Sequence, residues 1–356
     1  MIPSPPPLEV PVLLLVFRRL DTLRRVVDAL RAVRPTRVYI AADGPKAGDT
    51  ATAAKCAEVR QYLAEAIDWP CAVKTLYRDH NLGCGAAVSG GISWFFQHEV
   101  EGIILEDDTL PAPDFFPYCA GLLARHRDDK RVMCISGDNF QDGQWRGEGD
   151  YYFSKHPHCW GWASWRRAWE LNTNAFPGLH EAPHADWWQS IHEDPAESLY
   201  WERAFHTAQR GEVDTWDYQW TYACWQHGGL TALPNVNLVA NIGFGGEATH
   251  TMDATHQWSE RKTGTLESLR APAAVARDVD ADLYTFTHHH CPAGSEAERI
   301  LWEALIKQQR RENKDLRRKV VEMEKQNASI AKELKWAVAN KWKAARRLLS
   351  GRWPEV

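Results

Sequence analysis

The sequence predicts a mixed α/β fold built on a mostly parallel sheet, followed by one long C-terminal helix. In the first half, short apolar runs alternate with segments whose apolar residues recur at helical spacing, which is typical of strand–helix–strand units. Near the C-terminal end, apolar residues recur at alternating intervals of four and three. A chain of 356 residues with 44% hydrophobic positions can bury one sizeable core and carry an accessory segment.

The first half contains the strands and helices of the expected parallel sheet. Residues 12–17 are apolar and indicate a buried strand, after which Asp21 caps a helix that Pro35 ends. The same alternation then repeats. Further strands are expected at 38–42, 72–77 and 102–105, and further helices at 51–67 and 85–98.

The composition changes after residue 150. Eighteen tryptophans is an unusual number, and most of them fall between Trp145 and Trp258. Indoles pack on the apolar faces of sugars but also fill cores, and we expect core filling for most of them. We divide the chain into two halves of one domain, 1–150 and 151–292, and a helical segment at 293–356.

The helical segment carries a heptad pattern that predicts a coiled coil. Asn313 and Asn327 both fall at a positions, where a buried amide favours a defined register and a low oligomer number. A homodimer or trimer follows, and the alternative is a single amphipathic helix lying on the body. The pattern comprises Trp302, Ile306, Gln309, Asn313, Leu316, Val320, Met323, Asn327, Ile330, Leu334 and Ala337.

Beyond the heptads, residues 335–352 hold six basic and no acidic residues. Such a helix suits peripheral contact with an anionic membrane surface, and equally a solvated helix end that matches the helix dipole. Residues 293–356 carry 16 Lys and Arg and 9 Asp and Glu, a net charge of +7. Because the whole chain has a net charge of −5, residues 1–292 carry −12. That acidic body excludes nucleic-acid binding as its main role.

The cysteines and the N-terminal region indicate the compartment. Eight cysteines lie far apart with no C-x-x-C pair, which fits a reducing environment. The apolar run at 10–17 contains Pro11 and stops at Arg18, too short for a membrane span and wrong for a signal peptide. We expect a cytoplasmic protein, with contact at the inner face of the membrane through the basic helix as a further option.

Three adjacent carboxylates, Glu106, Asp107 and Asp108, follow the buried strand at 102–105. Parallel sheets place ligands at the carboxyl ends of their strands. Crowded carboxylates repel one another, and a divalent cation relieves the repulsion while bridging to a diphosphate. The cluster therefore predicts a Mn²⁺ or Mg²⁺ site.

Several ordered segments resemble the N-acetylglucosaminyltransferase I group and related bacterial family-2-like transferases. The resemblance spans about residues 11–250 and implies a GT-A, Rossmann-like fold that binds a nucleotide-sugar donor, a UDP-sugar first, in 1–150 and an acceptor in 151–292. The segments are Ile-Ile-Leu-Glu-Asp-Asp at 103–108 with Pro-Asp-Phe-Phe at 113–116, Cys-Trp-Gly-Trp-Ala at 159–163 with Arg-Ala-Trp at 167–169, and Asn-Ile-Gly-Phe-Gly at 241–245 with Thr-His at 249–250.

The resemblance implies roles at the donor site. Asp108 would coordinate the metal, and Glu106 and Asp107 would contact the ribose. Asp43 would accept from uracil, although its Asp-Gly-Pro sequence also suits a plain turn. His250, in a glycine-rich segment that suits a lid, would complete the metal shell or contact the diphosphate, unless it is an ordinary surface histidine.

Two further positions complete the donor side. Arg18 would lie beside the nucleotide, but its neighbour Arg19 is an equal candidate for the inward position. Asn81, in the Asn-Leu-Gly sequence before the helix at 85–98, would help direct the amino end of that helix toward the donor.

For the acceptor side, the resemblance points to Trp160, Gly161, Trp162 and Trp216, and to Asp217 as the base of an inverting transfer. Asp217 lies in Thr-Trp-Asp-Tyr-Gln-Trp at 215–220, where indoles create low-polarity surroundings. It can also cap the helix that follows. Asp214 and Asp186 are rival bases.

The sequence thus predicts a metal-dependent, inverting glycosyltransferase acting on a glycan or glycosylated carrier. A sugar nucleotidyltransferase is the weaker alternative, because no glycine follows the first strand at 17–20 to cradle a triphosphate. A catalytically silent scaffold in a polysaccharide assembly complex is another. Adjacent His288, His289 and His290 cannot all face one ion on a regular element, so we expect no metal there.

Overall fold

The computed structural model describes residues 6–244 and 261–349, with side chains as far as residue 341. The chain forms two compact units, Met1–Ala293 and Gly294–Val356. The first unit holds the sheet and both candidate ligand cavities.

The expected strands of the first half pair in parallel. Their order in the sheet is β3-β2-β1-β4, so the first strand lies between the second and the fourth. This confirms the mostly parallel α/β sheet predicted from the alternating apolar runs. The four strands are β1 (Val12–Val16), β2 (Arg37–Ala42), β3 (Ala72–Tyr77) and β4 (Glu101–Glu106).

Four more strands extend the sheet to eight in the order β3-β2-β1-β4-β8-β6-β9-β7. Strands β8 and β7 run antiparallel to their neighbours, whereas β6 and β9 pair in parallel. One sheet therefore runs through residues on both sides of position 150. The added strands are β6 (Val132–Ser136), β7 (Tyr151–Ser154), β8 (Trp162–Trp165) and β9 (Leu230–Pro234); β5 (Thr109–Pro111) and β10 (Val239–Asn241) form a separate antiparallel pair.

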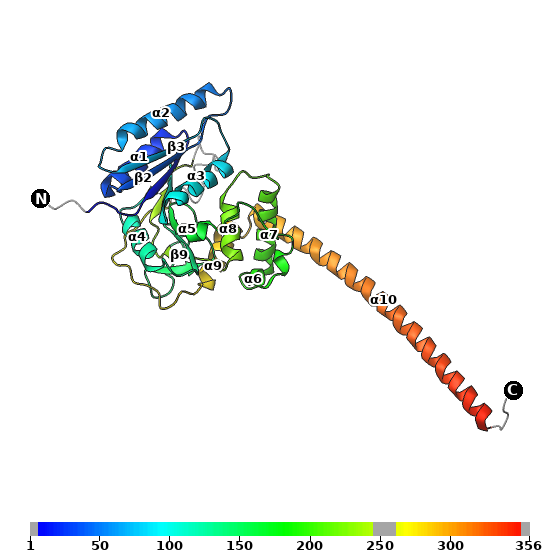
Figure 1. Ribbon diagram of the computed structural model, residues 1–356. Coiled ribbons are helices and arrows are strands. Elements are labelled where there is room, and N and C mark those ends of the chain that lie inside the picture. Colours follow the sequence, from blue (N-terminus) through cyan, green and yellow to red (C-terminus); the bar gives the residue numbers. More distant parts are fainter. Residues whose placement is uncertain (1–5, 245–260, 350–356) are drawn as a thin grey trace. The chain divides into compact units, whose positions relative to one another are not determined.

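Helices cover both faces of the sheet (Figure 1). Side chains alternate between the faces of a strand, and in β1 Val12 and Leu14 join one hydrophobic cluster while Leu13 and Leu15 join the other. The first cluster includes α1 (Leu20–Val33), α2 (Thr50–Ala66) and α4 (Phe115–Arg125). The second includes α3 (Cys84–His98), α5 (Arg166–Trp169), α6 (Asp186–Gln189), α7 (Pro195–Gln209) and α8 (Asp217–Gln226).

Seven of the eighteen tryptophans lie in the second cluster and two more pack against it, so core filling accounts for half of them there. Trp162 stacks on Trp216 with ring centroids 5.6 Å apart, and Trp169 packs on Trp220 at 5.3 Å. Such pairs add to the burial of the large indole surface. The buried tryptophans are Trp69, Trp162, Trp165, Trp169, Trp188, Trp201, Trp216, Trp220 and Trp225.

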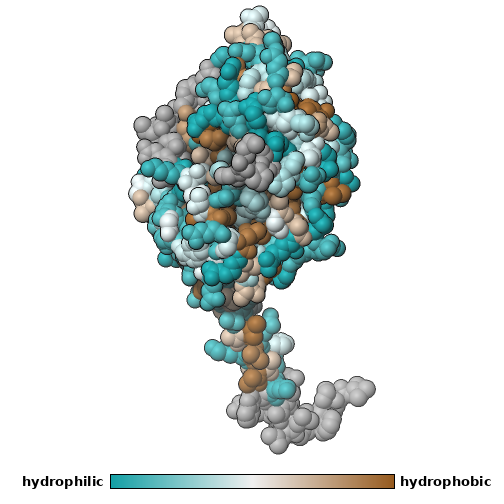
Figure 2. Space-filling model, turned by 90° about the vertical axis from the view of Figure 1, so that its left-hand side faces the viewer, coloured by the Kyte–Doolittle hydropathy of each residue, from teal (hydrophilic) through white to brown (hydrophobic). Residues whose placement is uncertain are grey.

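The second unit contains a single continuous helix, α10 (Glu296–Leu349), of 54 residues. Apolar side chains of the heptad pattern are exposed along it, with Leu316 57% and Ile330 54% exposed (Figure 2). The long C-terminal helix is confirmed, and its assembly into a coiled coil stays a prediction. Among the described residues, no helix has the length and apolarity needed to cross a membrane.

Candidate functional site

A cavity of about 280 Å³ lies at the carboxyl ends of β1, β2 and β4. The structure brings the described residues expected at the donor site to its walls, although they come from four segments of the chain. Four cationic side chains also line it, namely Arg18, Arg19, Lys46 and Arg78. The expected donor residues on its walls are Arg18, Asp43, Asn81, Glu106 and Asp107.

The acid cluster is held by Arg19. Its guanidinium lies 3.1 Å from Asp107 Oδ1 and 2.8 Å from Asp108 Oδ2, and Phe17 N donates to Asp107 Oδ2 at 3.1 Å. Arg18 instead donates to the Thr52 hydroxyl at 3.5 Å. Of the two arginines that the sequence could not separate, Arg19 is the one that pairs with the carboxylates.

Burial and mutual repulsion make the ionised cluster unfavourable. Burial raises the pKa of Glu106 to about 8, with added repulsion from Asp108 and Asp107. Burial likewise raises the pKa of Asp107 to about 6, although Arg19 opposes the shift. The cluster therefore favours a bound cation.

The carboxylate oxygens of the acid cluster fit a Mn²⁺ or Mg²⁺ ion that a phosphate of the substrate also binds. These ions take oxygen ligands and commonly use one or two carboxylates, with phosphate and water completing the shell. Asp108 and Asp107 would supply the carboxylates. No group of three or more His, Cys, Asp and Glu side chains is arranged for a metal in 6–244 and 261–349, so a phosphate ligand is part of this fit. His250 lies outside the described residues.

The segment that leads toward His250 begins directly against the acid cluster. Ile242 N donates to the Asp108 carbonyl at 2.8 Å, and Gly243 N donates to Asn241 Oδ1 at 2.9 Å. A Cβ on Gly243 would overlap the Asp108 carboxylate. A larger residue here would therefore displace the Asp108 carboxylate and the Arg19 guanidinium that pairs with it.

The Asp43 carboxylate anchors the loop beside the cavity by accepting hydrogen bonds. Its carboxylate accepts from Gly44 N at 2.9 Å, Asn81 Nδ2 at 2.8 Å and Leu82 N at 3.1 Å. It thereby fastens the segment before α3 to the end of β2. Asp43 lines the cavity as well, and its contact with a nucleotide stays a prediction.

Asp214 caps α3. Its carboxylate oxygens accept from Cys84 N at 2.8 Å and Gly85 N at 2.9 Å. The first amides of α3 are therefore engaged by Asp214, while Gly83, Cys84, Ala87 and Val88 at this end of the helix line the cavity. That the amino end of α3 faces a donor stays a prediction.

Asp217 is the first residue of α8 and lines a second cavity of about 290 Å³. It accepts a hydrogen bond from Tyr218 N at 3.0 Å and another from the Thr215 hydroxyl. Its charge contributes to raising the pKa of Glu106, which lines the first cavity. The rival Asp186 is exposed and is not among the residues that line either cavity.

Of the four residues expected to contact an acceptor, Trp160 lines the second cavity. Trp162 and Trp216 are 0% and 4% exposed and stack on each other, so core packing accounts for them. Gly161 has φ +71°, and a Cβ there would lie 2.8 Å from Val239 Cγ2. These three are packing residues, which corrects the expectation.

The second cavity contains polar residues that the sequence did not single out as a site. Asp138 and four imidazoles, those of His156, His158, His289 and His290, line it. His156 and His158 come more than a hundred residues before His289 and His290, and the local signals were His-Pro-His at 156–158 and the three histidines at 288–290.

Comparisons with known proteins give partial resemblances. No protein-family model and no curated protein matches the chain. A solved structure of GalNAc-T7 with UDP, GalNAc and Mn²⁺ is similar at a TM-score of 0.40 and 15% identity, over 64% of this chain and 43% of that one. HddC from Yersinia pseudotuberculosis, complexed with GMP-PN, is similar at a TM-score of 0.27 and 11% identity, over 44% of this chain and 77% of that one. The chain thus spans less than half the length of the GalNAc-T7 chain.

Proposed function

We propose that the chain is a GT-A-type glycosyltransferase that moves a sugar from a nucleotide diphosphate donor to a hydroxyl of a glycan or glycosylated carrier. One observation carries the proposal: the acid cluster and four cationic side chains line one cavity, and Asp217, whose charge acts on Glu106 of that cluster, lines another. Cationic walls suit a diphosphate, and a half-buried carboxylate suits proton removal from a hydroxyl.

In the proposed reaction, Arg18 and Lys46 bind the donor phosphates, and Asp43 and Asn81 shape the nucleotide end of the cavity. Asp108 and Asp107 would hold a divalent cation, which would neutralise the diphosphate leaving group when bound. Asp217 accepts the proton of the attacking hydroxyl, whose oxygen forms the new bond to the anomeric carbon as the diphosphate departs. Attack from the side opposite the diphosphate inverts the anomeric configuration. The sequence motifs favour a UDP-sugar as donor.

Donor turnover with Asp217→Asn tests the proposal. Release of nucleoside diphosphate is measured for a panel of nucleotide sugars with Mn²⁺, first with water and then with a mixture of glycans as acceptor. We expect Asp217→Asn to reduce transfer by about 10²-fold or more, and the exposed Asp186→Asn to leave it unchanged.

Product configuration supplies an independent readout. NMR of the product is expected to show an inverted anomeric centre. A retained configuration, or full transfer by Asp217→Asn, would contradict the role of Asp217 as base. Loss of nucleotide binding in both variants would indicate a folding defect rather than lost chemistry.

The turn at Phe17, Arg18 and Arg19 makes a nucleotidyltransferase the weaker alternative. Both arginine side chains line the cavity, and Arg19 is engaged with Asp107 and Asp108, so this turn does not offer a glycine-rich cradle of amides. A silent scaffold predicts that no nucleotide binds.

A further inference from the structure

The second cavity is a built polar pocket that the donor site does not use. Its walls combine the imidazoles of His156, His158 and His290 with the aromatic rings of Phe140 and Trp201. These side chains pack closely: His158 lies 4.4 Å from Phe140 and His290 lies 5.0 Å from Trp201, centroid to centroid. The walls are therefore supported by one another and do not depend on a ligand to form.

Three imidazole nitrogens in this wall lack hydrogen-bond partners among the described residues. They are the Nε2 atoms of His156, His158 and His290, each shielded from solvent; that of His156 lies 3.9 Å from Glu197 Oε1, beyond hydrogen-bond distance. His156 as a residue is 2% exposed. An unpaired buried polar atom costs free energy, and a ligand that supplies the missing bond recovers it.

The pocket selects against negatively charged ligands, because its walls include the carboxyl groups of Asp138 and Asp217. None of the described residues on its walls is Lys or Arg. Burial lowers the pKa of His290 to about 3, and the pKa values of His156 and His158 lie well below that of an ordinary histidine. These imidazoles are therefore neutral near pH 7, and each can donate through one nitrogen and accept through the other.

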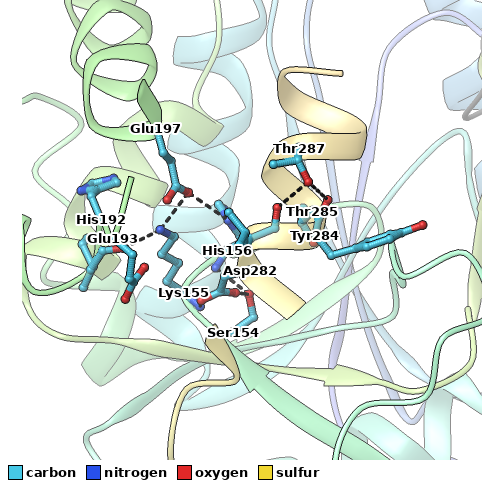
Figure 3. A network of polar contacts seen from close by, with 12 residues as sticks. Ser154, Lys155, His156, His192, Glu193, Glu197, Asp282, Tyr284, Thr285 and Thr287 are labelled. Carbon is cyan, nitrogen blue, oxygen red and sulfur yellow. Dashed lines mark hydrogen bonds and ion pairs between the residues drawn. The ribbon is translucent and has the colours of Figure 1, made fainter. Parts of the chain in front are cut away.

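A fixed network holds this wall in place (Figure 3). Lys155 Nζ lies 2.8 Å from Glu197 Oε1, and the Ser154 hydroxyl donates to Asp282 Oδ1 at 2.5 Å while accepting from His156 N at 2.9 Å. Lys155 is thus committed to Glu197 and is not a cationic contact for a ligand.

We infer that this pocket, lined by His156, His158, His290, Trp160 and Trp201, binds a single uncharged sugar ring. Hydroxyl groups both donate and accept, as neutral imidazoles do, and indole faces pack on the apolar faces of sugars. A volume of about 290 Å³ admits one ring rather than an oligosaccharide. The inference rests on the proposed function for the identity of that ring, namely the acceptor residue whose hydroxyl faces Asp217; the same chemistry could also come from the sugar of the donor.

Ligand-observed NMR with the full-length protein tests the pocket. The probes are the methyl glycosides of glucose, galactose, mannose, N-acetylglucosamine and N-acetylgalactosamine, with methyl glucuronide as the charged counterpart. We expect one or more neutral glycosides to bind, and His290→Leu to weaken that binding about tenfold through one lost hydrogen bond. His288→Leu is the matched control, because His288 lies on the same short helix but is exposed and outside the pocket.

The two sources of the ring give different results. An acceptor ring binds as a free glycoside alongside UDP and Mn²⁺. A donor ring instead makes a UDP-sugar bind more tightly than UDP, with an advantage that His290→Leu removes and His288→Leu keeps. Either result supports a sugar pocket. Tyr218→Phe, which removes a lining hydroxyl at nearly constant volume, provides the same comparison if His290→Leu does not fold.

Three results would overturn the inference: no glycoside or sugar effect in folded protein, equal binding by His290→Leu and wild type, or tighter binding of the glucuronide. Glycoside binding without any nucleotide binding would leave the pocket intact and reject the glycosyltransferase instead. Different results therefore test the sugar pocket and the glycosyltransferase activity.

Discussion

Replacement of Lys155 by methionine is the sharpest stability test of the region behind the second cavity. Lys155 and Glu197 are 1% and 2% exposed, and their Nζ and Oε1 atoms lie 2.8 Å apart (Figure 3). Lys155 Nζ also donates to the Ile191 carbonyl at 2.5 Å. Lys155→Met removes both contacts and leaves a buried carboxylate without its cation.

The magnitude follows from the geometry of the pair. Two unit charges at this separation attract by about 6 kcal/mol at an effective dielectric of about 20. Desolvation of both groups offsets part of that attraction, and breaking a buried pair by removing one partner typically costs about 3–5 kcal/mol. We expect Lys155→Met to lower the free energy of unfolding by that amount at pH 8.

The loss should shrink in acid. Burial raises the pKa of Glu197 and Lys155 opposes the shift, so the variant carboxyl has a still higher pKa. A group whose pKa is raised on folding gains stability as the pH falls through its folded pKa, because the folded state then binds the proton. The cost should therefore be smaller at pH 5.5 than at pH 8.

Urea denaturation at the two pH values is the assay. Lys155→Met with Glu197→Gln should recover part of the loss, because no buried charge remains. Arg210→Met is the matched control: its pair with Glu212 is more than half exposed and screened by solvent, so we expect a much smaller loss than for Lys155→Met. A cost below 1 kcal/mol for Lys155→Met, or the same cost at both pH values, would refute the reasoning.

Three further changes test other parts of the account. Arg19→Gln unpairs Asp107 and Asp108 and should cost about 2–4 kcal/mol in urea unfolding, whereas Arg18→Gln should cost under about 1 kcal/mol; equal costs would contradict the assignment of Arg19 as the cluster's partner. Burial lowers the pKa of His192 to about 3, so as the pH falls the unfolded chain protonates this histidine before the folded chain does. The free energy of unfolding therefore decreases as the pH drops below about 6.5, by about 2 kcal/mol at pH 5. Between pH 7.5 and 5, His192→Gln should lose about 2 kcal/mol less than the wild type, and an equal loss would reject this. Leu316→Glu with Ile330→Glu should convert an oligomer to a monomer in sedimentation velocity, and a monomeric wild type would reject the coiled coil.

The parallel half of the fold could be predicted because its signals are local. The run at 12–17 is apolar on both faces, and Val12 and Leu13 indeed enter opposite hydrophobic clusters. The acid cluster was predictable for a related reason, because three carboxylates directly after a buried strand must lie at its end. These features need only the order of the residues.

The antiparallel strands and the packing tryptophans were harder to predict. β8 contains Trp162 and Trp165, and an indole suits a core as well as a sugar-binding surface. Whether the Trp162 indole points into the core depends on its partner, here Trp216, which directly precedes the distant helix α8. Arg18 and Arg19 pose a similar problem, because the backbone conformation of the turn decides which of the two adjacent side chains points toward the acid cluster.

The histidine cavity could not be predicted because its chemistry is assembled from separate segments. His156 and His158 follow β7, whereas His289 and His290 end the short helix η2 (Phe286–His290). Each pair alone suggests a surface or a metal site. They form one wall of uncharged imidazoles only in the folded chain, where the ring centroids of His156 and His290 lie 5.3 Å apart.

Nucleotide binding tests the central claim most directly. Melting temperatures are measured with UDP, GDP, CDP or dTDP, each with Mn²⁺, Mg²⁺ or EDTA, for the wild type and Asp108→Ala. A ligand that binds only the folded state raises the melting temperature, and at a hundredfold excess over its Kd the gain is about 2.7 kcal/mol. The account predicts stabilisation by one diphosphate that requires the cation and is lost in Asp108→Ala. No shift with any pair, in protein that melts cooperatively, would contradict a glycosyltransferase and favour the scaffold.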